Sequence, residues 1–171
     1  QGLQPYQKNR YYEVKWNAQV PKTEYDITPQ RQKTQVVYMQ DDDLERLGGM
    51  GSDDYEEESV KGAVNWISYK SQFFSHVLIS KTGEIQAPRL ALATPSKSET
   101  VVKEMGSDFQ VDMTSLEDNT NSFIMYMGPN EYKTLRAFDV GLHKEMDLGY
   151  LFISQINVVT IYVFKFFEKY I

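Results

Sequence analysis

The chain has 171 residues, 41% hydrophobic and 13% aromatic, with 18 basic against 24 acidic side chains. Domains commonly have about 100–150 residues, so this length and composition fit one folded domain with a real core. The formal net charge of −6, with no basic cluster to offset it, argues against nucleic-acid binding. Because the chain contains no cysteine, disulfides, thiolate zinc sites and cysteine nucleophiles are excluded.

The first predicted element is a half-buried β-strand over residues 11–20. Apolar and polar residues alternate along it, which is the period of a strand with one face in a core. Pro21 is expected to end the strand because proline cannot donate to the ladder. The polar residues 22–33, which include Pro29, are predicted to form a loop, and residues 34–40 a second strand.

Residues 41–59 form the most acidic stretch of the chain, with Asp41–Asp43 and Glu56–Glu58 around several glycines. We interpret this stretch as a solvated acidic hairpin tip, in which Asp43 can cap a short helical turn at residues 44–47. Neither the spacing of a calcium loop nor the Gly-Lys-Ser/Thr of a phosphate loop is present.

Short strands are predicted to follow at intervals of about ten residues, the spacing typical of a β-sandwich. They cover residues 63–69, 73–80, 83–92, 100–102, 107–113 and 122–127. The strand at 73–80 is apolar on both faces, and we therefore expect it to be central in its sheet.

The pattern changes to helices after Gly128-Pro129, which are expected to close the last strand. Asn130 is predicted to cap a helix that begins at Glu131, and Gly141 to stop this helix in a left-handed conformation. The apolar stripe of this helix consists of Tyr132, Leu135, Ala137 and Phe138.

Residues 150–171 are apolar but contain too many polar and charged side chains for a spanning helix, which needs about 20 mostly apolar residues. As a helix, the segment has a broad apolar side opposite a polar one. The apolar side consists of Phe152, Ile153, Ile156, Val159, Val163, Phe164, Phe166, Phe167, Tyr170 and Ile171. Two interpretations remain open: a helix that lies in a bilayer interface, or one that buries its stripe on the protein's own sheet.

No active site and no metal or cofactor site is predicted. His76 lies within the apolar strand 73–80 and is interpreted as a satisfied core histidine. His143 is expected to meet the last carbonyls of the preceding helix. Neither belongs to a spaced ligand set, and the carboxylates gather where nothing apolar surrounds them, so they make poor general acids.

Three stretches occur in an order and spacing typical of a known family. They are Asn65-Trp66-Ile67 leading into Gln72-Phe73-Phe74, then Tyr126-Met127-Gly128-Pro129 opening a helix, then the residues 149–155 before the terminal helix. In these features the chain resembles the large periplasmic domain of the YidC membrane-protein insertases, and residues 11–20 are similar to the Bacteroidetes branch. The matching positions are Trp66, Phe73, Phe74, Gly128, Pro129, Leu135, Asp147, Gly149 and Phe152. Leu148 and Ile156 depart from the family pattern, which commonly has an aromatic residue and a proline there.

The resemblance implies a mainly β fold, a β-super-sandwich with a galactose-mutarotase-like outline and two C-terminal helices. It divides the chain into a sandwich part that ends in a short helix (1–142) and a link with a membrane-proximal amphipathic helix (143–171). The N-terminus has no Met and no apolar signal core, so we expect a piece of a longer protein. The resemblance implies that this piece begins part-way through the sandwich, with some partner strands missing.

The resemblance also implies a non-catalytic docking and orienting module at the periplasmic face of the inner membrane. Its implied partners are the lipid surface, the SecDF accessory complex and, through transmembrane helices expected after Ile171, nascent membrane proteins. Phe152, Ile156, Val159, Val163, Phe166, Phe167 and Tyr170 would face lipid or the sandwich, and Lys165 and Lys169 the head groups. The alternatives are a carbohydrate-binding or mutarotase-like sandwich, with His and carboxylates meeting in a cleft, and an adhesion sandwich unrelated to insertases.

Overall fold

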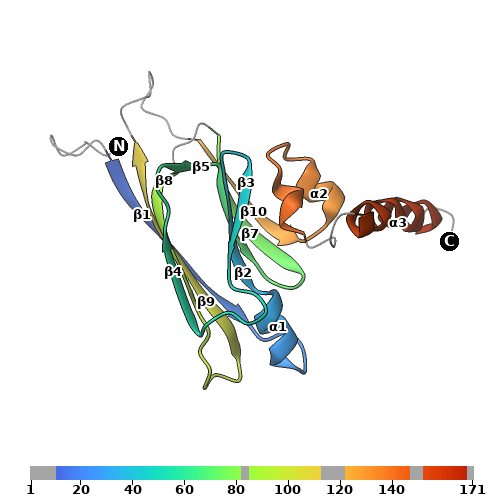
Figure 1. Cartoon of the computed structure of the whole chain (residues 1–171), viewed down its shortest axis with the longest axis horizontal. Helices are drawn as coiled ribbons and strands as arrows, with labels where there is room; N and C mark the ends of the chain where they lie inside the picture. The colour runs from blue at the N-terminus through green and yellow to red at the C-terminus, as the bar shows by residue number, and fades with distance from the viewer. Residues whose placement is uncertain (1–10, 82–84, 113–121, 147–151, 169–171) are drawn as a thin grey trace.

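The computed structural model describes residues 11–81, 85–112, 122–146 and 152–168. They fold into two antiparallel sheets that pack face to face, with short helices at one end and on one outer face (Figure 1). The expected class, a mainly β sandwich, is therefore confirmed.

The first sheet has the strand order β1-β9-β8-β4, and the short β5 also pairs with β8. Its strands are β1 (Tyr11–Pro21), β4 (Tyr55–Ser59), β5 (Ala63–Val64), β8 (Ile85–Ala93) and β9 (Val101–Asp112). Residues 100–102 and 107–113 were expected to form two strands, but β9 is one long strand that pairs with β1 along almost its whole length. The predicted alternation of β1 is confirmed, because its even-numbered residues are half-buried and its odd-numbered residues exposed.

The second sheet has the order β10-β7-β6-β2-β3. Its strands are β2 (Gln35–Gln40), β3 (Asp43–Leu47), β6 (Trp66–Lys70), β7 (Phe74–Ser80) and β10 (Phe123–Pro129). The predicted strand at 63–69 is divided at Asn65, since β5 belongs to the first sheet and β6 to the second. The prediction that the strand at 73–80 is internal is confirmed, because β7 lies between β10 and β6.

Two predictions for the N-terminal half were wrong. Residues 22–33 are not all loop, because helix α1 (Ile27–Lys33) forms there, capped by the Asp26 carboxylate, which accepts a hydrogen bond from Thr28 N at 2.9 Å. Pro29 lies in the first turn of this helix, where proline is tolerated. Residues 44–47 are in strand β3 and not in a helical turn. Asp41 and Asp42 have positive φ angles and form the two-residue turn of the β2–β3 hairpin.

The centre of the second sheet, strands β2 and β6, is buried on both faces. The larger hydrophobic cluster lies between the sheets and includes Val36, Tyr38, Ile67, Tyr69, Leu78, Leu90, Leu92, Met105, Phe109 and Val111. The smaller lies between the second sheet and the helices that cover its outer face, and includes Val37, Met39, Trp66, Val77, Ile79, Leu135 and Leu142. The helical cover explains why the second sheet is rich in apolar residues without strict alternation.

Only the first part of the acidic stretch is a solvated hairpin tip, because Asp41–Asp43 are exposed at the β2–β3 turn whereas the later residues cross from the second sheet to the first. Glu56–Glu58 lie on β4, where Glu57 forms an ion pair with Arg89 on β8. Glu56 accepts a hydrogen bond from Gly48 N at 2.8 Å. Beneath this crossover lies the buried Lys103, whose pKa is lowered by burial against the opposing charges of Glu56 and Asp54. Part of the acidic charge therefore compensates a buried cation.

Candidate functional site

Helix α2 (Tyr132–Arg136) and the 3₁₀ turn η1 (Leu142–Glu145) form a cap on the outer face of the second sheet (Figure 1). Trp66 on β6 is fully buried under this cap and donates from its indole Nε1 to the Val140 carbonyl oxygen at 2.9 Å. Leu135 and Leu142 are fully buried beside it. Trp66 and Leu135, both singled out in the sequence, thus join the cap to the sheet.

The start and end of α2 differ from the prediction. The helix begins at Tyr132, and Asn130 does not cap it. The Asn130 amide instead donates to the Ser71 carbonyl oxygen at 2.9 Å. Gly141 has the predicted left-handed conformation, with a φ of 71°, but it stands before η1 and does not end α2.

A buried carboxyl group fastens η1 to the sheet. Ser75 Oγ lies 2.6 Å from Glu145 Oε1 and 2.6 Å from Asn130 Oδ1. The Ser75 hydroxyl is thus shared between these two acceptors, while the Asn130 amide nitrogen donates to the Ser71 carbonyl oxygen. Burial raises the pKa of Glu145, an effect that the Ser68 and Ser75 hydroxyls and the charges of Lys70 and Arg46 reduce in part.

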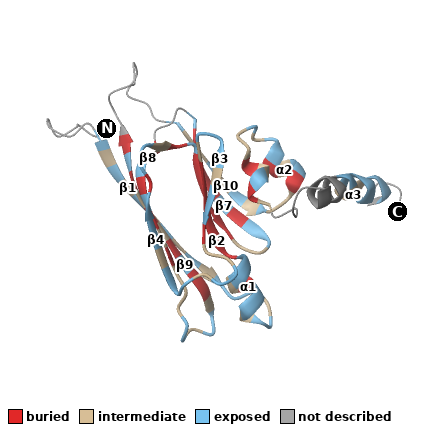
Figure 2. Cartoon of the chain, in the orientation of Figure 1, coloured by how far each residue is buried: buried red, intermediate tan, exposed pale blue. Residues whose placement is uncertain are grey.

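Helix α3 (Phe152–Glu168) lies beyond α2 and away from both sheets (Figure 2). Most of the side chains described on it are exposed although they are apolar, among them Val159, Tyr162, Val163, Phe164, Phe166 and Phe167. Phe164 is 69% exposed and Val159 62% exposed. These side chains do not pack on the sandwich, so the interpretation that the stripe is buried on the protein's own sheet is wrong for them.

Lys165 attaches α3 to the cap. Its ammonium group forms an ion pair with Glu131, the residue that precedes α2. The other oxygen of Glu131 accepts from the Thr134 hydroxyl at 2.6 Å. Lys165 was expected to face lipid head groups, and in the structure it is partly committed to this ion pair. Within the described part of the chain, no helix is long and apolar enough to cross a membrane.

Several residues singled out in the sequence lie outside what the structure describes. Asp147, Gly149, Lys169 and Tyr170 belong to undescribed segments, and the side chains of Phe152 and Ile156 are not described. Gly128 and Pro129 form the end of β10, where the Tyr126 hydroxyl donates to the Pro129 carbonyl oxygen at 2.7 Å.

The inner faces of β7 and β10 carry exposed side chains at one edge of the sandwich. Leu78 belongs to the core between the sheets, and alternation puts Phe74 and His76 on the same face of β7. Met125 and Met127 lie opposite Leu78 and His76 in the β7–β10 register and therefore share that face. We refer to Phe74, His76, Met125 and Met127 as the ledge; its Phe and Met side chains are more than half exposed. His76 is thus exposed, and its assignment as a core histidine was wrong.

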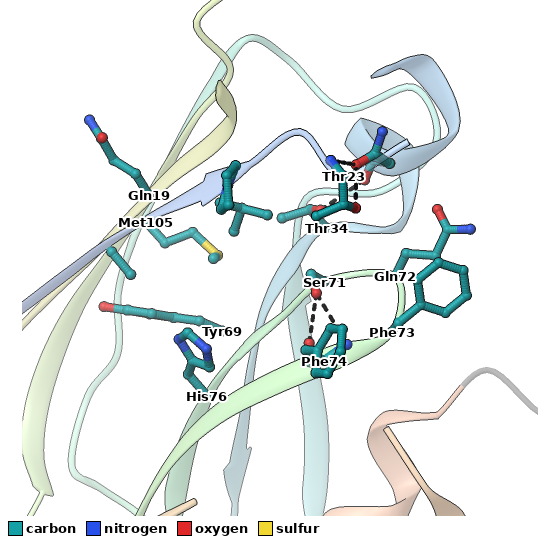
Figure 3. Close-up of a pocket in the computed structure, with 14 residues that line it drawn as sticks. Gln19, Thr23, Thr34, Tyr69, Ser71, Gln72, Phe73, Phe74, His76 and Met105 are labelled. Carbon is teal, nitrogen blue, oxygen red and sulfur yellow. Dashed lines mark hydrogen bonds between the residues drawn. The ribbon is translucent and has the colours of Figure 1, made fainter. Parts of the chain in front are cut away.

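A pocket of about 240 Å³ opens between the two sheets next to the ledge (Figure 3). Its walls come from the end of β1, from α1 and from the turn between β6 and β7. Val20, Tyr69, Phe73, Phe74 and Met105 supply much of the apolar lining, and Gln19, Gln72 and His76 contribute polar groups. No Asp or Glu is among the residues that line it. Phe73 and Phe74, both singled out in the sequence, therefore lie at a surface opening.

The arrangement of titratable groups offers little acid–base chemistry. His143 packs edge-on against the Tyr132 ring, and burial together with the nearby Arg136 and Lys144 lowers the pKa of its imidazole. Across the described ranges, no three His, Asp or Glu side chains gather as metal ligands would. The sequence signal for the ledge was present in the strand SFIMYM, which is apolar on both faces, but it could not show which face lacks a partner.

Comparison with known proteins identifies a matching family and several similar proteins. Residues 1–158 match the family model described as the YidC periplasmic domain. Similar proteins include the membrane protein insertases YidC of Amoebophilus asiaticus (25% identical over 158 residues, 91% of this chain) and Bacteroides fragilis (29% over 146 residues, 82% of this chain). That of Cytophaga hutchinsonii is 29% identical over 152 residues, 83% of this chain. The matched regions are 26%, 22% and 24% of the respective relatives, so the chain spans about a quarter of the length of these curated relatives.

Proposed function

Because the chain belongs to the YidC periplasmic domain family, which is non-catalytic, we propose that it is the docking and orienting module of a membrane-protein insertase. It works at the periplasmic face of the bacterial inner membrane. There it holds the insertase in a defined orientation to the lipid surface while membrane proteins are inserted and folded. The insertion step itself belongs to the transmembrane part of such a protein.

The observation that carries this proposal is the exposed apolar side of α3. Solvent-exposed aromatic side chains in a row are costly in water, and apolar area gains about 25 cal/mol per Å² when it leaves water. Phe164, Phe166 and Phe167 are each at least half exposed and have no cover from the sandwich. An amphipathic helix of this kind suits the boundary between head groups and acyl chains.

The helical spacing of the apolar residues places further side chains on the same side of α3. Phe152, Ile156, Val159, Val163, Phe166, Phe167 and Tyr170 are proposed to face lipid, and Lys165 and Lys169 to lie near the head groups. The chain is accordingly proposed to work as two parts, a sandwich with its cap (1–142) and a membrane-proximal link and helix (143–171). We also propose that the sandwich has the outline of the larger mutarotase-like super-sandwiches.

The partners follow from the insertase context. They are the lipid surface, membrane proteins in the course of insertion and, by family resemblance, the SecDF accessory complex. The mutarotase-like alternative, with His and carboxylates meeting in one cleft, is not proposed, because none of the residues that line the pocket next to the ledge is acidic.

Flotation with liposomes of phosphatidylethanolamine and phosphatidylglycerol tests the proposal. The full chain is expected to float with the vesicles, and the double variant Phe166→Ser/Phe167→Ser to remain largely at the bottom of the gradient. The matched control is Phe73→Ser/Phe74→Ser, which removes two equally exposed phenylalanines at the pocket mouth and is expected to float like the original chain.

A chain truncated after Gly149 provides the complementary test, since it lacks α3 entirely. Equal flotation of the full and truncated chains would contradict a membrane-surface role for α3. An equal loss of flotation in the two double phenylalanine variants would show that exposed aromatic residues adhere to the vesicles unspecifically. This result would also overturn the proposal.

A further inference from the structure

An open hollow of about 560 Å³ lies between the cap and α3. Side chains of both elements line it: Glu131, Lys133, Thr134, Ala137, Phe138 and Lys165. Lys165 belongs to α3, and the other five lie on α2 or directly beside it. The hollow is therefore situated where the helix that is proposed to rest on the bilayer meets the rest of the domain (Figure 1).

The carboxylate in this hollow is already engaged. One oxygen of Glu131 forms the ion pair with Lys165, and the other accepts the hydrogen bond from the Thr134 hydroxyl at 2.6 Å. A cation beside it thus compensates its negative charge. An ammonium group has three N–H donors, so Lys165 keeps donors for a further acceptor in the hollow.

The second lysine of the hollow has no such partner. Lys133 is exposed, and within the described ranges no side chain forms an ion pair or a hydrogen bond with its ammonium group. The described lining therefore carries two ammonium groups against one carboxylate, an excess of positive charge in a chain whose net charge is −6. Such a local excess favours an anionic ligand.

One wall of the hollow is apolar. Ala137 is exposed there, and the Phe138 ring lies edge-on against Tyr126, with 5.3 Å between the ring centroids. A free phosphate ion gains nothing from such a wall, whereas the glycerol and the first methylene groups of a phospholipid leave water against it. Ammonium groups beside an apolar wall match the part of a phospholipid where the phosphodiester meets the acyl chains.

We propose that this hollow binds the head group of an anionic phospholipid, phosphatidylglycerol. Lys133 and Lys165 contact its phosphodiester, and Phe138 packs against its glycerol and upper acyl chain. A zwitterionic head group fits less well, because its own cation needs an acceptor and both oxygens of Glu131 are engaged. The inference rests on the proposed membrane-surface role of α3, since a helix among the head groups brings the hollow to the same depth.

The hollow gives the membrane contact of the domain a direction. The apolar side of α3 alone provides a contact along one line, about which the sandwich can still tilt. A lipid held between α3 and the cap adds a second contact to the side of this line, so that the cap side of the sandwich faces the bilayer. Each lysine near an anionic membrane surface strengthens binding about fivefold.

Co-sedimentation of the 171-residue chain with two kinds of vesicle tests the proposal. One kind is pure phosphatidylcholine, and in the other a part of it is replaced by phosphatidylglycerol. The original chain is expected to bind the anionic vesicles more tightly, and Lys133→Gln to lose about fivefold in affinity for these vesicles only. Lys133→Arg keeps the charge and is expected to bind like the original chain.

Lys144→Gln is the matched control, because Lys144 is also an exposed lysine of the cap but does not line the hollow. It is expected to lose clearly less affinity for the anionic vesicles than Lys133→Gln does. Equal losses in the two variants would show a diffuse attraction of the cap to the anionic surface, and would overturn the proposal of a site.

A short-chain lipid tests the hollow without a bilayer. Dihexanoyl phosphatidylglycerol, kept below its micelle concentration, is expected to shift the NMR signals of the Lys133 and Thr134 amides, and Lys133→Gln to weaken this binding. Glycerol 3-phosphate and dihexanoyl phosphatidylcholine are the comparison ligands. Equal or tighter binding of glycerol 3-phosphate would show a site for free phosphate, and equal binding of the choline lipid would show no preference for an anion. Either result would overturn the proposal.

The two experiments distinguish this proposal from the membrane role of α3. Equal binding of the original chain to both kinds of vesicle would overturn the anionic site and leave the membrane role intact. Phe166→Ser/Phe167→Ser is expected to weaken binding to both kinds of vesicle and to leave binding of the short-chain lipid unchanged. If the original chain bound neither kind of vesicle, the membrane role would be contradicted, and absence of the NMR shifts would separately refute the hollow.

Discussion

The rings of Trp16 and Tyr69 stack at 4.0 Å with 19° between their planes, and the Tyr69 hydroxyl donates to the Trp16 carbonyl oxygen at 2.6 Å. Ser107 Oγ lies 2.7 Å from the same hydroxyl and acts as its donor, because the Tyr69 proton is already used. This one contact joins β1 and β9 of the first sheet to β6 of the second.

Removal of the Tyr69 hydroxyl should destabilise the sandwich. Tyr69→Phe keeps the stacked ring but leaves the buried Ser107 hydroxyl without its partner, and we expect a loss of about 1–3 kcal/mol in the free energy of unfolding. Urea denaturation measures it. Tyr126→Phe is the control, because its hydroxyl also bonds a carbonyl, that of Pro129, but in an exposed position. Equal losses in the two variants would contradict a buried junction at Tyr69.

Glu145 should make the stability depend on pH in an unusual direction. Burial raises its pKa in the folded state above the ordinary value of 4.5, so the folded chain binds this proton more tightly than the unfolded chain does. Its contribution is complete below pH 4.5 and is lost as the pH rises through the raised pKa. Urea denaturation from pH 4 to 8 should show that Glu145→Gln gains stability relative to the original chain as the pH rises.

Glu57 should make the stability depend on pH in the opposite direction to Glu145. The hydrogen bonds from Arg89 and Tyr55 lower the pKa of its carboxyl to about 2. Its contribution is therefore present at neutral pH and declines only as the pH falls below the ordinary value of 4.5. A Glu145→Gln profile parallel to that of the original chain would show that folding does not raise the pKa of Glu145.

Two glycines with left-handed conformations should differ sharply in their tolerance of alanine. A Cβ on Gly48 would lie 2.4 Å from Leu92 Cδ2, whereas a Cβ on Gly51 would meet nothing within 4 Å. Both positions carry the cost of a left-handed alanine, about 1–2 kcal/mol, but only Gly48→Ala adds overpacking of about 1–3 kcal/mol. Thermal denaturation should therefore give a lower midpoint for Gly48→Ala than for Gly51→Ala. Similar midpoints would refute close packing between the crossover and β8.

The ion pair between Lys165 and Glu131 should contribute to the position of α3 more than to global stability. Both side chains are more than a third exposed, so a double-mutant cycle in urea should give less than about 1 kcal/mol. Hydrogen exchange of the α3 amides should nevertheless become faster in Lys165→Ala, because this ion pair joins α3 to Glu131 beside the cap. Unchanged exchange would mean that other contacts hold the helix.

Sequence reasoning succeeded where local pattern and burial agree. Strand β1 shows strict alternation, and one of its faces does lie on the core. Sequence reasoning failed where the burial of a strand face depends on residues that are distant in the chain. His76 has an apolar strand around it, yet it is exposed. Helix α1 was missed because its short polar sequence has no apolar stripe, and its Asp26 cap was the available signal.

The sequence alone determined the mainly β character, the amphipathic terminal helix and the family, because alternation, helical period and motif order are written in neighbouring residues. Only the tertiary structure decided that Trp66 lies buried under a helical cap, that burial raises the pKa of Glu145, and that the side chains Phe74, Met125 and Met127 of β7 and β10 are exposed. Burial and strand pairing bring together residues far apart in the chain, and their effect on a side chain depends on which sheet or helix lies above it.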